Sequence, residues 1–562
     1  MSMSIAETYA ALTAPGAPFE MEERDIFGMR TRVWKNAPPN LRAILEQSRV
    51  HGDLPFLVYE DERMTYAGHL QAVARMACAL TGRFGIRKGD RIAIAMRNFP
   101  EWSIAFWATT AVGAISVPLN AWMTGPELEY CLSDSGSVLL ITDAERAERL
   151  APHLAALDLR ATIVARGGKP LAAGMLDFGD VLNDAPVDAT LPDVAIDPED
   201  DATIFYTSGT TGKPKGALGT HRNICTNLLS LAFSAARAKL RRGEKLPGPD
   251  EPQPKKSYLL SVPFFHVTGC HSVLAASLFA GNKLVLMRRW NPERAMQLIE
   301  RERINGFGGV PSMAWQVIES PDFGRYDLSS VESVGYGGAP AAAELVARIG
   351  GRMPAAQASN GYGMTETSSV TTQNVGEDYQ RKPDSAGLAV PICDLRVVDA
   401  SGRDVEPGGN GELWVKGANI VKGYWNNPEA TAQSFTDGWL HTGDVVRIDD
   451  EGFLYILDRA KDMLIRGGEN IYCVEVEDAL YSHPAVMDAA VIGIPHRVLG
   501  EEVAAVVQLK PGMSVSEDEL KRHAATRIAA FKVPVRIALC QEPLPRNPNG
   551  KILKRDLKSA FD

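Results

Sequence analysis

Short runs of β-branched and other apolar residues recur along the chain and alternate with longer segments of mixed polarity. Residues 91–96 (RIAIAM), 137–143 (SVLLITD), 283–287 (KLVLM) and 488–494 (DAAVIGI) have the length and composition of buried strands. The segments between such runs are long enough to form helices. This alternation predicts an α/β fold.

Two stretches without charged residues, 102–126 and 258–282, are long enough to span a bilayer. The first is interrupted by polar residues, glycine and proline, and its order predicts a helix, a glycine turn and the strand AISVP. The second carries Pro263, His266 and His271 between its apolar parts, which predicts a strand followed by a helix. We therefore expect both stretches to lie in a buried core, and we expect no integral membrane span.

The composition changes twice in the last third of the chain. Residues 387–458 are rich in turns and short strand-like runs, and a compact α/β pattern follows them. The charged run 458–462 suits a hinge between two rigid bodies. We predict a large N-terminal α/β domain of several subdomains, residues 1–459, and a small, mobile C-terminal α/β domain, residues 460–562. The charged, proline-rich segment 237–256 is predicted to be a solvated surface loop.

Length, charge and cysteine content narrow the kinds of partner. The chain has 562 residues, more than one domain needs, and its 59 basic and 69 acidic residues give a net charge of −10. This charge disfavours nucleic acid, so we expect small molecules or proteins as partners. The seven cysteines include no Cys-x-x-Cys pair, so the sequence indicates neither a zinc site nor a disulfide framework. The N-terminus lacks the features of a secretory signal, which predicts a cytoplasmic protein.

Residues 206–216 (YTSGTTGKPKG) follow an apolar run and combine hydroxyl side chains, glycines and two lysines. Glycines let backbone N–H groups approach an anion, hydroxyls donate hydrogen bonds and lysines neutralise charge, so the pattern predicts a loop that binds polyphosphate. It is not a Walker A loop, because Thr207 stands where that motif has glycine and Pro214 where it has Ser or Thr. The candidate phosphate-binding residues are Thr207, Ser208, Gly209, Thr210, Thr211, Gly212, Lys213 and Lys215.

Four further motifs follow, and together with this loop they resemble the motifs of the adenylate-forming superfamily, which comprises acyl-CoA synthetases, nonribosomal-peptide adenylation domains and luciferases. Residues 360–367 (NGYGMTET) resemble its adenine and magnesium motif, and 438–444 (GWLHTGD) its ribose motif. Residues 458–461 (DRAK) resemble its hinge, and 545–551 (PRNPNGK) its catalytic-lysine motif. The five motifs occur in the superfamily's order.

The resemblance implies roles for residues at the nucleotide. Glu366 is implied to bind Mg²⁺, and a carboxylate is the hard oxygen ligand that this ion prefers. Thr365 is implied to lie near the phosphate and Tyr362 to stack on adenine. Asp444 and Arg459 are implied to bind the ribose. The remaining residues implied at the nucleotide are Gly337, Gly338, Ala339, Pro340, Asn360, Gly361, Gly363 and Met364.

The resemblance also implies a catalytic residue on the C-terminal domain. Lys551 is implied to be the catalytic lysine, which the mobile domain delivers to the reacting phosphate as negative charge develops there. Lys461 occupies the hinge position. Gly467 and Gly468 resemble the strand that lines the pantetheine tunnel, where the lack of side chains leaves room for CoA.

Residues 263–266 (PFFH) resemble the segment that lines the superfamily's acyl pocket, where the histidine lies beside the substrate carboxylate. We therefore count His266, with Lys551 and Glu366, among the catalytic candidates. Small residues at 269 and 270 are expected to leave space in this pocket. The acyl-pocket candidates are Phe265, His266, Gly269, Cys270, Phe307, Val310 and Tyr336.

The resemblance implies a two-step reaction that uses ATP, Mg²⁺ and CoA. A carboxylate first attacks the α-phosphate of ATP, giving an acyl-adenylate and pyrophosphate; a thiol then attacks the acyl group and AMP leaves. No carrier-protein domain follows Lys551, so free CoA is the expected acceptor. We expect an acid–thiol ligase, an AMP-forming acyl-CoA synthetase for a medium- or long-chain fatty acid. An aryl acid such as a benzoate or cinnamate stays open as the substrate, as do loading of a carrier protein and an oligomeric state.

Overall fold

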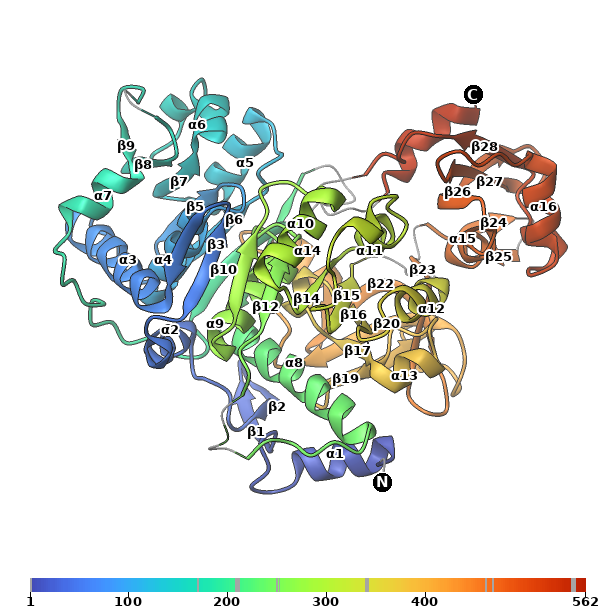
Figure 1. Ribbon diagram of the computed structural model, residues 1–562, viewed down its shortest axis with the longest axis horizontal. Coiled ribbons are helices and arrows are strands. Elements are labelled where there is room, and N and C mark those ends of the chain that lie inside the picture. Colours follow the sequence, from blue (N-terminus) through green and yellow to red (C-terminus); the bar gives the residue numbers. More distant parts are fainter. Residues whose placement is uncertain are drawn as a thin grey trace.

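The computed structural model describes residues 3–168, 171–207, 213–248, 251, 253–338, 343–459, 462–466, 469–546 and 552–561. Two large sheets with their helices form most of the N-terminal part, and a small α/β domain lies at the C-terminal end (Figure 1). The predicted fold class is therefore confirmed.

The first large sheet is mostly parallel. Its neighbouring strands run parallel except for the last pair, β10 and β11, which form an antiparallel hairpin. The strands predicted at 91–96 and 137–143 are confirmed as members of this sheet. In the described chain its order is β11 (Lys215–Thr220), β10 (Asp201–Thr207), β6 (Ile115–Leu119), β5 (Arg91–Ala95), β7 (Leu139–Asp143), β8 (Ala161–Ala165) and β9 (Met175–Asp177), with helices α3 (Tyr66–Cys78), α4 (Pro100–Ala111), α5 (Gly125–Ser135), α6 (Ala144–Leu150) and α7 (Phe178–Asp184) around it.

The second large sheet has a parallel centre with antiparallel strands at both edges. In the described chain its order is β18 (Leu388–Ala389), β17 (Thr372–Val375), β16 (Gln357–Tyr362), β15 (Ser333–Gly337), β14 (Gly306–Gly309), β12 (Ser257–Leu260), β13 (Lys283–Leu286), β3 (Pro55–Tyr59) and β4 (Glu62–Thr65). The helices around it are α2 (Leu41–Gln47), α8 (His221–Arg241), α9 (Ala276–Ala280), α10 (Pro292–Glu302), α11 (Pro311–Ile318), α12 (Ala343–Arg352) and α13 (Gly376–Arg381). The strand predicted at 283–287 is confirmed as β13.

Helix α4 packs in the core that the two large sheets share. Nearly all of its residues are buried, including Trp102 and Trp107. A helix buried on all sides needs no polar face, which explains the uncharged stretch 102–126. Gly113 follows with a φ of 70°, a left-handed conformation that suits glycine, and β6 comes next. The predicted helix, glycine turn and strand are confirmed.

The second uncharged stretch, 258–282, is also a strand followed by a helix, as predicted. It contains β12, a π-helical segment (Thr268–Ala275) and α9, all packed in the core. Of the helices that the structure describes, none has both the length and the apolar character that crossing a membrane requires.

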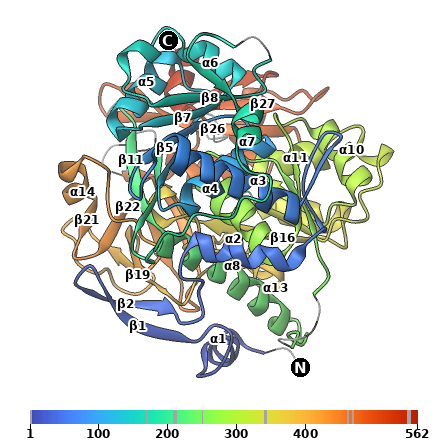
Figure 2. The ribbon, with the colours of Figure 1, turned by 90° about the vertical axis from the view of Figure 1, so that its left-hand side faces the viewer.

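Two smaller units complete the N-terminal part. An antiparallel sheet contains β19 (Cys393–Val398), β20 (Gly411–Gly417), β21 (Phe435–Thr436), β22 (Trp439–Ile448) and β23 (Leu454–Arg459), with helix α14 (Pro428–Ser434) beside it. Near the N-terminus, helix α1 (Ile5–Thr13) packs on α8, and the hairpin of β1 (Met21–Ile26) and β2 (Met29–Trp34) lies beside them (Figure 2).

The C-terminal domain has a hydrophobic core of its own. Its elements are β24 (Leu464–Arg466), β25 (Glu469–Ile471), α15 (Cys473–Tyr481), β26 (Val486–His496), β27 (Gly500–Leu509), α16 (Glu517–Ala525), β28 (Arg536–Cys540) and a 3₁₀ segment (Lys554–Phe561). The strand predicted at 488–494 is confirmed within β26. Asp458 at the end of β23 accepts a hydrogen bond from the Cys473 backbone N–H at 2.5 Å, which joins this domain to the rest of the chain. The boundary between residues 459 and 460 stays a prediction.

The prediction of a solvated loop over 237–256 is wrong at its start. Helix α8 continues to Arg241, and Arg237 is only 1% exposed. Its guanidinium donates hydrogen bonds to the carbonyl oxygen of Gln373 at 2.7 Å and to the hydroxyl of Tyr9 at 3.1 Å. The charge of Arg237 therefore joins α8 to β17 and α1 instead of facing solvent.

Candidate active site

A cavity of about 1280 Å³ lies between α8 and the second large sheet. Ligand sites of open α/β sheets lie at the carboxyl ends of parallel strands, and this cavity includes the residues that follow β12, β14 and β15 there. It then continues along the strands to their opposite ends, at Gly306 of β14, Ser333 of β15 and Gln357 of β16. The cavity therefore crosses the full length of the sheet.

One end of the cavity carries groups suited to phosphate. Thr207 and Lys215 are paired in the β10–β11 hairpin, and both line the cavity. The 3₁₀ turn Thr365–Thr367 contacts β11 and adds Thr365 and Glu366. A lysine, two hydroxyls and a carboxylate therefore lie together at this end of the cavity. These groups match the charges of a nucleoside triphosphate with a bound cation.

Glu366 is held in place by a partner that sequence reasoning missed. The side chain is 5% exposed, and its Oε1 accepts a hydrogen bond from the Tyr424 hydroxyl at 2.7 Å. The Nζ of Lys215 lies 5.3 Å from the centre of the same tyrosine ring, so Tyr424 contacts both charged groups. Lys213, by contrast, lies 5.1 Å from the ring of Tyr130 and does not line the cavity.

The donor set also suits a magnesium ion that arrives with the nucleotide. Among the described residues, no group of three or more His, Cys, Asp or Glu side chains could hold a metal ion. Glu366 supplies one carboxylate beside the hydroxyls of Thr365 and Thr207. Magnesium is commonly held by one or two carboxylates together with substrate phosphates and water. Glu366 alone is therefore a sufficient protein carboxylate.

Asp444, Arg459 and Tyr362 form a hydrogen-bonded cluster at the edge of the cavity. Asp444 of β22 and Arg459 of β23 are cross-strand neighbours, with Arg459 Nε 2.7 Å from Asp444 Oδ1. The Tyr362 hydroxyl donates to Asp444 Oδ2 at 2.6 Å. Burial, reinforced by the charge of Asp444, raises the pKa of Tyr362 well above its usual value, so this hydroxyl stays protonated. Arg459 lines the cavity, whereas Asp444 and Tyr362 lie behind it in this structure.

His266 lies at the wall of the cavity, between the phosphate end and the part beneath α8. Burial lowers the pKa of its imidazole to about 4, so the ring is neutral at pH 7. Its Nε2 is buried and has no hydrogen-bond partner among the described residues. Phe265 packs edge-on against the His266 ring, with the ring centres 4.8 Å apart. The imidazole is therefore held as an uncharged group with one nitrogen available to a ligand.

Small residues on both walls create the part of the cavity beneath α8. One face of α8 presents Ala232, Ala235 and Ala238 to the cavity, and the first two are exposed to it. On the opposite wall Gly361 of β16 has open space around the position that a Cβ would occupy. Other glycines on that wall are Gly306, Gly308, Gly335 and Gly363. Larger side chains at Ala232, Ala235 or Gly361 would fill the space, whereas a Cβ on Gly308 or Gly363 would stand 1.6 or 1.4 Å from a backbone oxygen, so those two glycines permit close backbone packing.

The structure has no open cavity space at residues 269 and 270, where the sequence predicted it. A Cβ on Gly269 would stand 2.1 Å from the carbonyl oxygen of Pro263, so this glycine permits close backbone packing. Cys270 is fully buried in the hydrophobic core. Neither residue lines the cavity, and neither does Phe265, which packs between His266 and Trp122.

Many of the candidate residues share this one cavity. Those that line it are Thr207, Lys215, His266, Phe307, Val310, Tyr336, Gly337, Gly338, Gly361, Gly363, Met364, Thr365, Glu366 and Arg459. Asn360 does not line it. The candidates that lie outside the described residues are Ser208, Gly209, Thr210, Thr211, Gly212, Ala339, Pro340, Lys461, Gly467, Gly468 and Lys551.

Sequence reasoning missed the whole wall formed by α8. Its cavity residues recur at spacings of three and four, from Leu228 and Leu231 through Ala235 to Lys239. That spacing marks one face of a helix, but the residue types on it do not distinguish a cavity wall from a packed core. Ser359 and Gln373 were also missed, since neither belongs to a recognisable motif.

A family model described as AMP-binding enzyme matches residues 44–425, and one described as AMP-binding enzyme C-terminal domain matches residues 475–551. The chain belongs to the AMP-binding enzyme family. The resemblance to the adenylate-forming superfamily is thereby confirmed. This AMP-binding enzyme is an acid–thiol ligase, since its relatives are AMP-forming CoA ligases.

Curated relatives of this AMP-binding enzyme act on different acids by name. It is 36% identical over 498 residues to a feruloyl-CoA synthase from an Amycolatopsis species, covering 89% of this chain and 94% of the relative. It is 34% identical over 534 residues to the long-chain-fatty-acid–CoA ligase FadD13 of Mycobacterium tuberculosis, covering 95% and 98%. The relatives therefore identify the family of this enzyme but not the acid that it uses.

Solved structures of similar fold contain an acyl-adenylate in one case and ATP in another. The anthranilate CoA ligase AuaEII in complex with anthranoyl-AMP has a TM-score of 0.83 and 27% identity, covering 93% of this chain and 97% of that one. The o-succinylbenzoate CoA synthetase MenE of Bacillus subtilis, in complex with ATP and a magnesium ion, has a TM-score of 0.76 and 31% identity, covering 93% and 100%.

Proposed function

We propose that this enzyme activates a carboxylic acid with an extended tail, a medium- or long-chain fatty acid, as its acyl-adenylate and transfers the acyl group to CoA. The observation that carries the proposal is the length of the cavity. From Gly306 to Val310 it follows β14 for about 13 Å at 3.3 Å per residue. From Leu228 to Lys239 it follows α8 for about 16 Å at 1.5 Å per residue.

These lengths favour an extended acid over an aryl acid. An extended hydrocarbon chain advances about 1.3 Å per carbon, the projection of a carbon–carbon bond of about 1.5 Å. About ten carbons therefore fit between the level of Val310 and the far end of the sheet. A cinnamate or benzoate would occupy only the part next to His266, leaving apolar wall uncovered. An aryl acid stays the alternative, because a feruloyl-CoA synthase is among the relatives.

In the first step the acid's carboxylate binds beside His266. Because burial keeps this imidazole neutral, it orients the carboxylate by a hydrogen bond without the ion pair that would reduce the nucleophilicity of the oxygen. A carboxylate oxygen attacks the α-phosphorus of ATP, and the bond from this phosphorus to the pyrophosphate oxygen breaks.

Charge develops on the phosphate oxygens during this attack. Thr207 and Lys215, which line this end of the cavity, are proposed to donate hydrogen bonds to those oxygens, and Lys551 is proposed to approach from the C-terminal domain. Glu366 would hold Mg²⁺ together with the phosphates, and the ion would neutralise part of the same charge. The Asp444–Arg459 pair is proposed to bind the ribose by exchanging one of its present hydrogen bonds for a sugar hydroxyl.

In the second step the sulfur of CoA attacks the acyl carbon and the bond to AMP breaks. We place the hinge of the required domain rotation at Lys461 and the pantetheine passage at Gly467 and Gly468. Support for a rotation comes from the C-terminal domain, which has its own hydrophobic core and contacts the rest of the chain at a small number of places, among them Asp458 of β23 and the pair Asn410 and Tyr472.

The experiment that tests the proposal is a chain-length profile of thioester formation. Purified enzyme receives ATP, Mg²⁺, CoA and one acid at a time, from butyrate through decanoate to palmitate, with ferulate and benzoate as aryl acids. We expect kcat/KM to rise with each added carbon up to about C10 and then to level off. A maximum at ferulate would assign the aryl alternative. Acyl-adenylate without any acyl-CoA would indicate a carrier protein as acceptor.

A further inference from the structure

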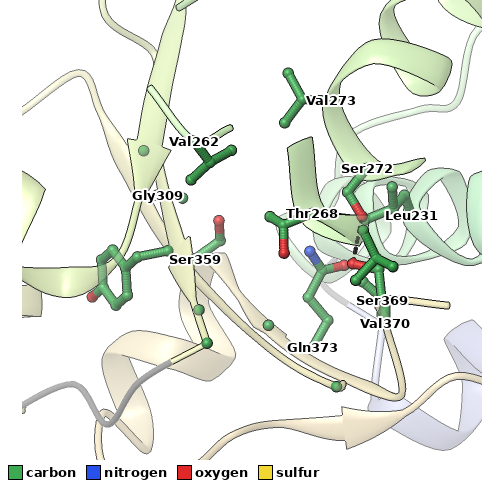
Figure 3. Close-up of a pocket in the computed structure, with 18 of the residues that line it drawn as sticks. Leu231, Val262, Thr268, Ser272, Val273, Gly309, Ser359, Ser369, Val370 and Gln373 are labelled. Atoms are coloured by element: carbon green, nitrogen blue, oxygen red, sulfur yellow. Dashed lines mark hydrogen bonds between the residues drawn. The ribbon is translucent and has the colours of Figure 1, made fainter. Parts of the chain in front are cut away.

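Three side chains that line the cavity carry polar groups without a hydrogen-bond partner among the described residues. Thr268 begins the π-helical segment after His266, Ser359 lies on β16 and Gln373 lies on β17 (Figure 3). In Figure 3 the hydroxyls of Thr268 and Ser359 and the amide of Gln373 point into the same space from different sides. None of the three side chains has a hydrogen-bond partner among the described residues.

Gln373 is the most constrained of the three. Its backbone is paired with Gly361 in the β16–β17 ladder, and its carbonyl oxygen accepts the hydrogen bond from the buried Arg237. Its side-chain oxygen, Oε1, is buried and has no partner among the described residues. A buried amide oxygen without a partner is unfavourable, and its location at a ligand cavity indicates that a ligand supplies the partner.

The hydroxyl groups next to Gln373 do not supply the missing hydrogen-bond partner. Ser272 and Ser369 lie close by in Figure 3, and their hydroxyl oxygens are 2.8 Å apart, hydrogen-bonded to each other. Ser272 also accepts a hydrogen bond from the side chain of Asn227 at 3.3 Å. These two serines are therefore satisfied within the protein, while the side chain of Gln373 has no partner in the part of the chain that the structure describes.

The positions of the three groups along the cavity determine which part of a bound acid would contact them. Gly361, the partner of Gln373, lies between Tyr362 and Ser359 on β16, and Thr268 is two residues beyond His266. The groups are therefore past the expected carboxylate position and before the far end of the cavity at Gln357, which is two residues from Ser359 on β16. An acid bound there passes them partway along its tail.

We propose that the enzyme's acid carries an oxygen function, a hydroxyl or a keto group, partway along its tail, and that Gln373, Thr268 and Ser359 bind it. This inference rests on the proposed function, because it assumes that the acid extends along the cavity from His266. An amide N–H and two hydroxyls donate to a carbonyl or hydroxyl oxygen, and the amide oxygen accepts from a hydroxyl. The carboxylate reacts as before, and the oxygen function sets specificity only.

The test compares decanoate with its isomers hydroxylated singly at C4 to C9, and with the matching oxodecanoates, by kcat/KM for CoA-thioester formation. We expect one or two neighbouring positions to exceed decanoate by about tenfold or more, because a site with unpaired hydrogen-bonding groups rejects an analogue that lacks the partner. The pair 4-coumarate and cinnamate shows whether a hydroxyl borne by a ring has the same effect.

Variants then assign the effect to Gln373. Gln373→Leu should remove the preference, lowering kcat/KM for the preferred isomer about tenfold relative to kcat/KM for decanoate measured on the same variant. The matched control is Gln357→Leu, the same change at the far end of the cavity, where Gln357 already accepts a hydrogen bond from Arg242 at 2.8 Å. This control should keep the preference. Ser359→Ala provides a second, smaller change if Gln373→Leu does not fold.

Two results would overturn the inference. Decanoate used as well as every oxygenated isomer would show that water alone satisfies these groups, and equal losses on all acids in Gln373→Leu and Ser359→Ala would show a structural role only. Absence of thioester from every acid, oxygenated or not, would overturn the proposed function itself. The two failures are thus distinguishable.

Discussion

Ala235→Phe tests whether the cavity beneath α8 holds the acyl tail. Ala235 lies seven residues beyond Leu228 on the helix, about 10 Å along its axis. Its side chain is exposed to the cavity, so a phenyl ring there grows into open space instead of into packed core. The fold should therefore tolerate the substitution, and the thermal unfolding midpoint should stay within a few degrees of the wild-type value.

The expected effect depends on the length of the acid. At about 1.3 Å per carbon, a ring at this level stops a straight chain after about eight carbons. Because the wild-type cavity holds about ten carbons, dodecanoate then loses burial of about two methylenes, at about 0.8 kcal/mol each, or about 1.6 kcal/mol in all. This corresponds to a loss of about fifteenfold in kcat/KM. Octanoate should lose little.

The assay is acyl-CoA formation with octanoate and dodecanoate, measured for wild type, Ala235→Phe and the control Ala235→Ser. The serine keeps the space open, so both acids should react at close to their wild-type rates. Equal activity of Ala235→Phe on both acids would show that the tail lies elsewhere, and the length argument for the substrate would then fail.

Four further predictions concern the reaction centre and the pH dependence of stability. Lys551→Ala should lower acyl-adenylate formation by about a hundredfold or more, the effect of removing a transition-state charge donor, with ATP binding retained in a titration. Lys461→Pro should leave adenylation largely intact and block thioester formation, measured as separate half-reactions. Tyr424→Phe should raise the Mg²⁺ concentration for half-maximal rate by about tenfold, because Glu366 loses the hydroxyl that orients it. The pKa of His266 is lowered by burial to about 4, so the unfolded state binds its proton more readily; stability should be fully present above pH 6.5 and fall as pH drops from there towards 4, seen as a decreasing unfolding midpoint. A midpoint that rises on acidification would contradict a buried neutral His266.

The residues predicted from motifs are those whose chemistry depends on a short local segment. Thr365 and Glu366 share one turn, and Thr207 and Lys215 share one hairpin, so their spacing in the sequence already predicts that they act together. The uncharged stretch 102–126 is likewise predicted to form a buried helix and strand, because its glycine and polar residues argue against a membrane span.

The shape of the acyl cavity could not be predicted from short segments of the sequence. It depends on α8 lying opposite strands that are far away in the sequence, and only that arrangement turns Ala235 and Gly361 into facing walls. The prediction for Gly269 failed for a local reason, because a Cβ there would meet the backbone of Pro263 and not the ligand space. Arg237 appeared to begin a surface loop because its partner, the carbonyl of Gln373, is 136 residues away.

An internal competition between dodecanoate and ferulate tests the central claim most directly. Both acids, at equal concentration, share one reaction with enzyme, ATP, Mg²⁺ and limiting CoA, and the two thioesters are quantified by mass spectrometry. Their ratio gives the ratio of kcat/KM without reference to the active fraction of the enzyme. The extended cavity predicts dodecanoyl-CoA in excess by about tenfold or more. An excess of feruloyl-CoA would contradict the proposed fatty-acid substrate.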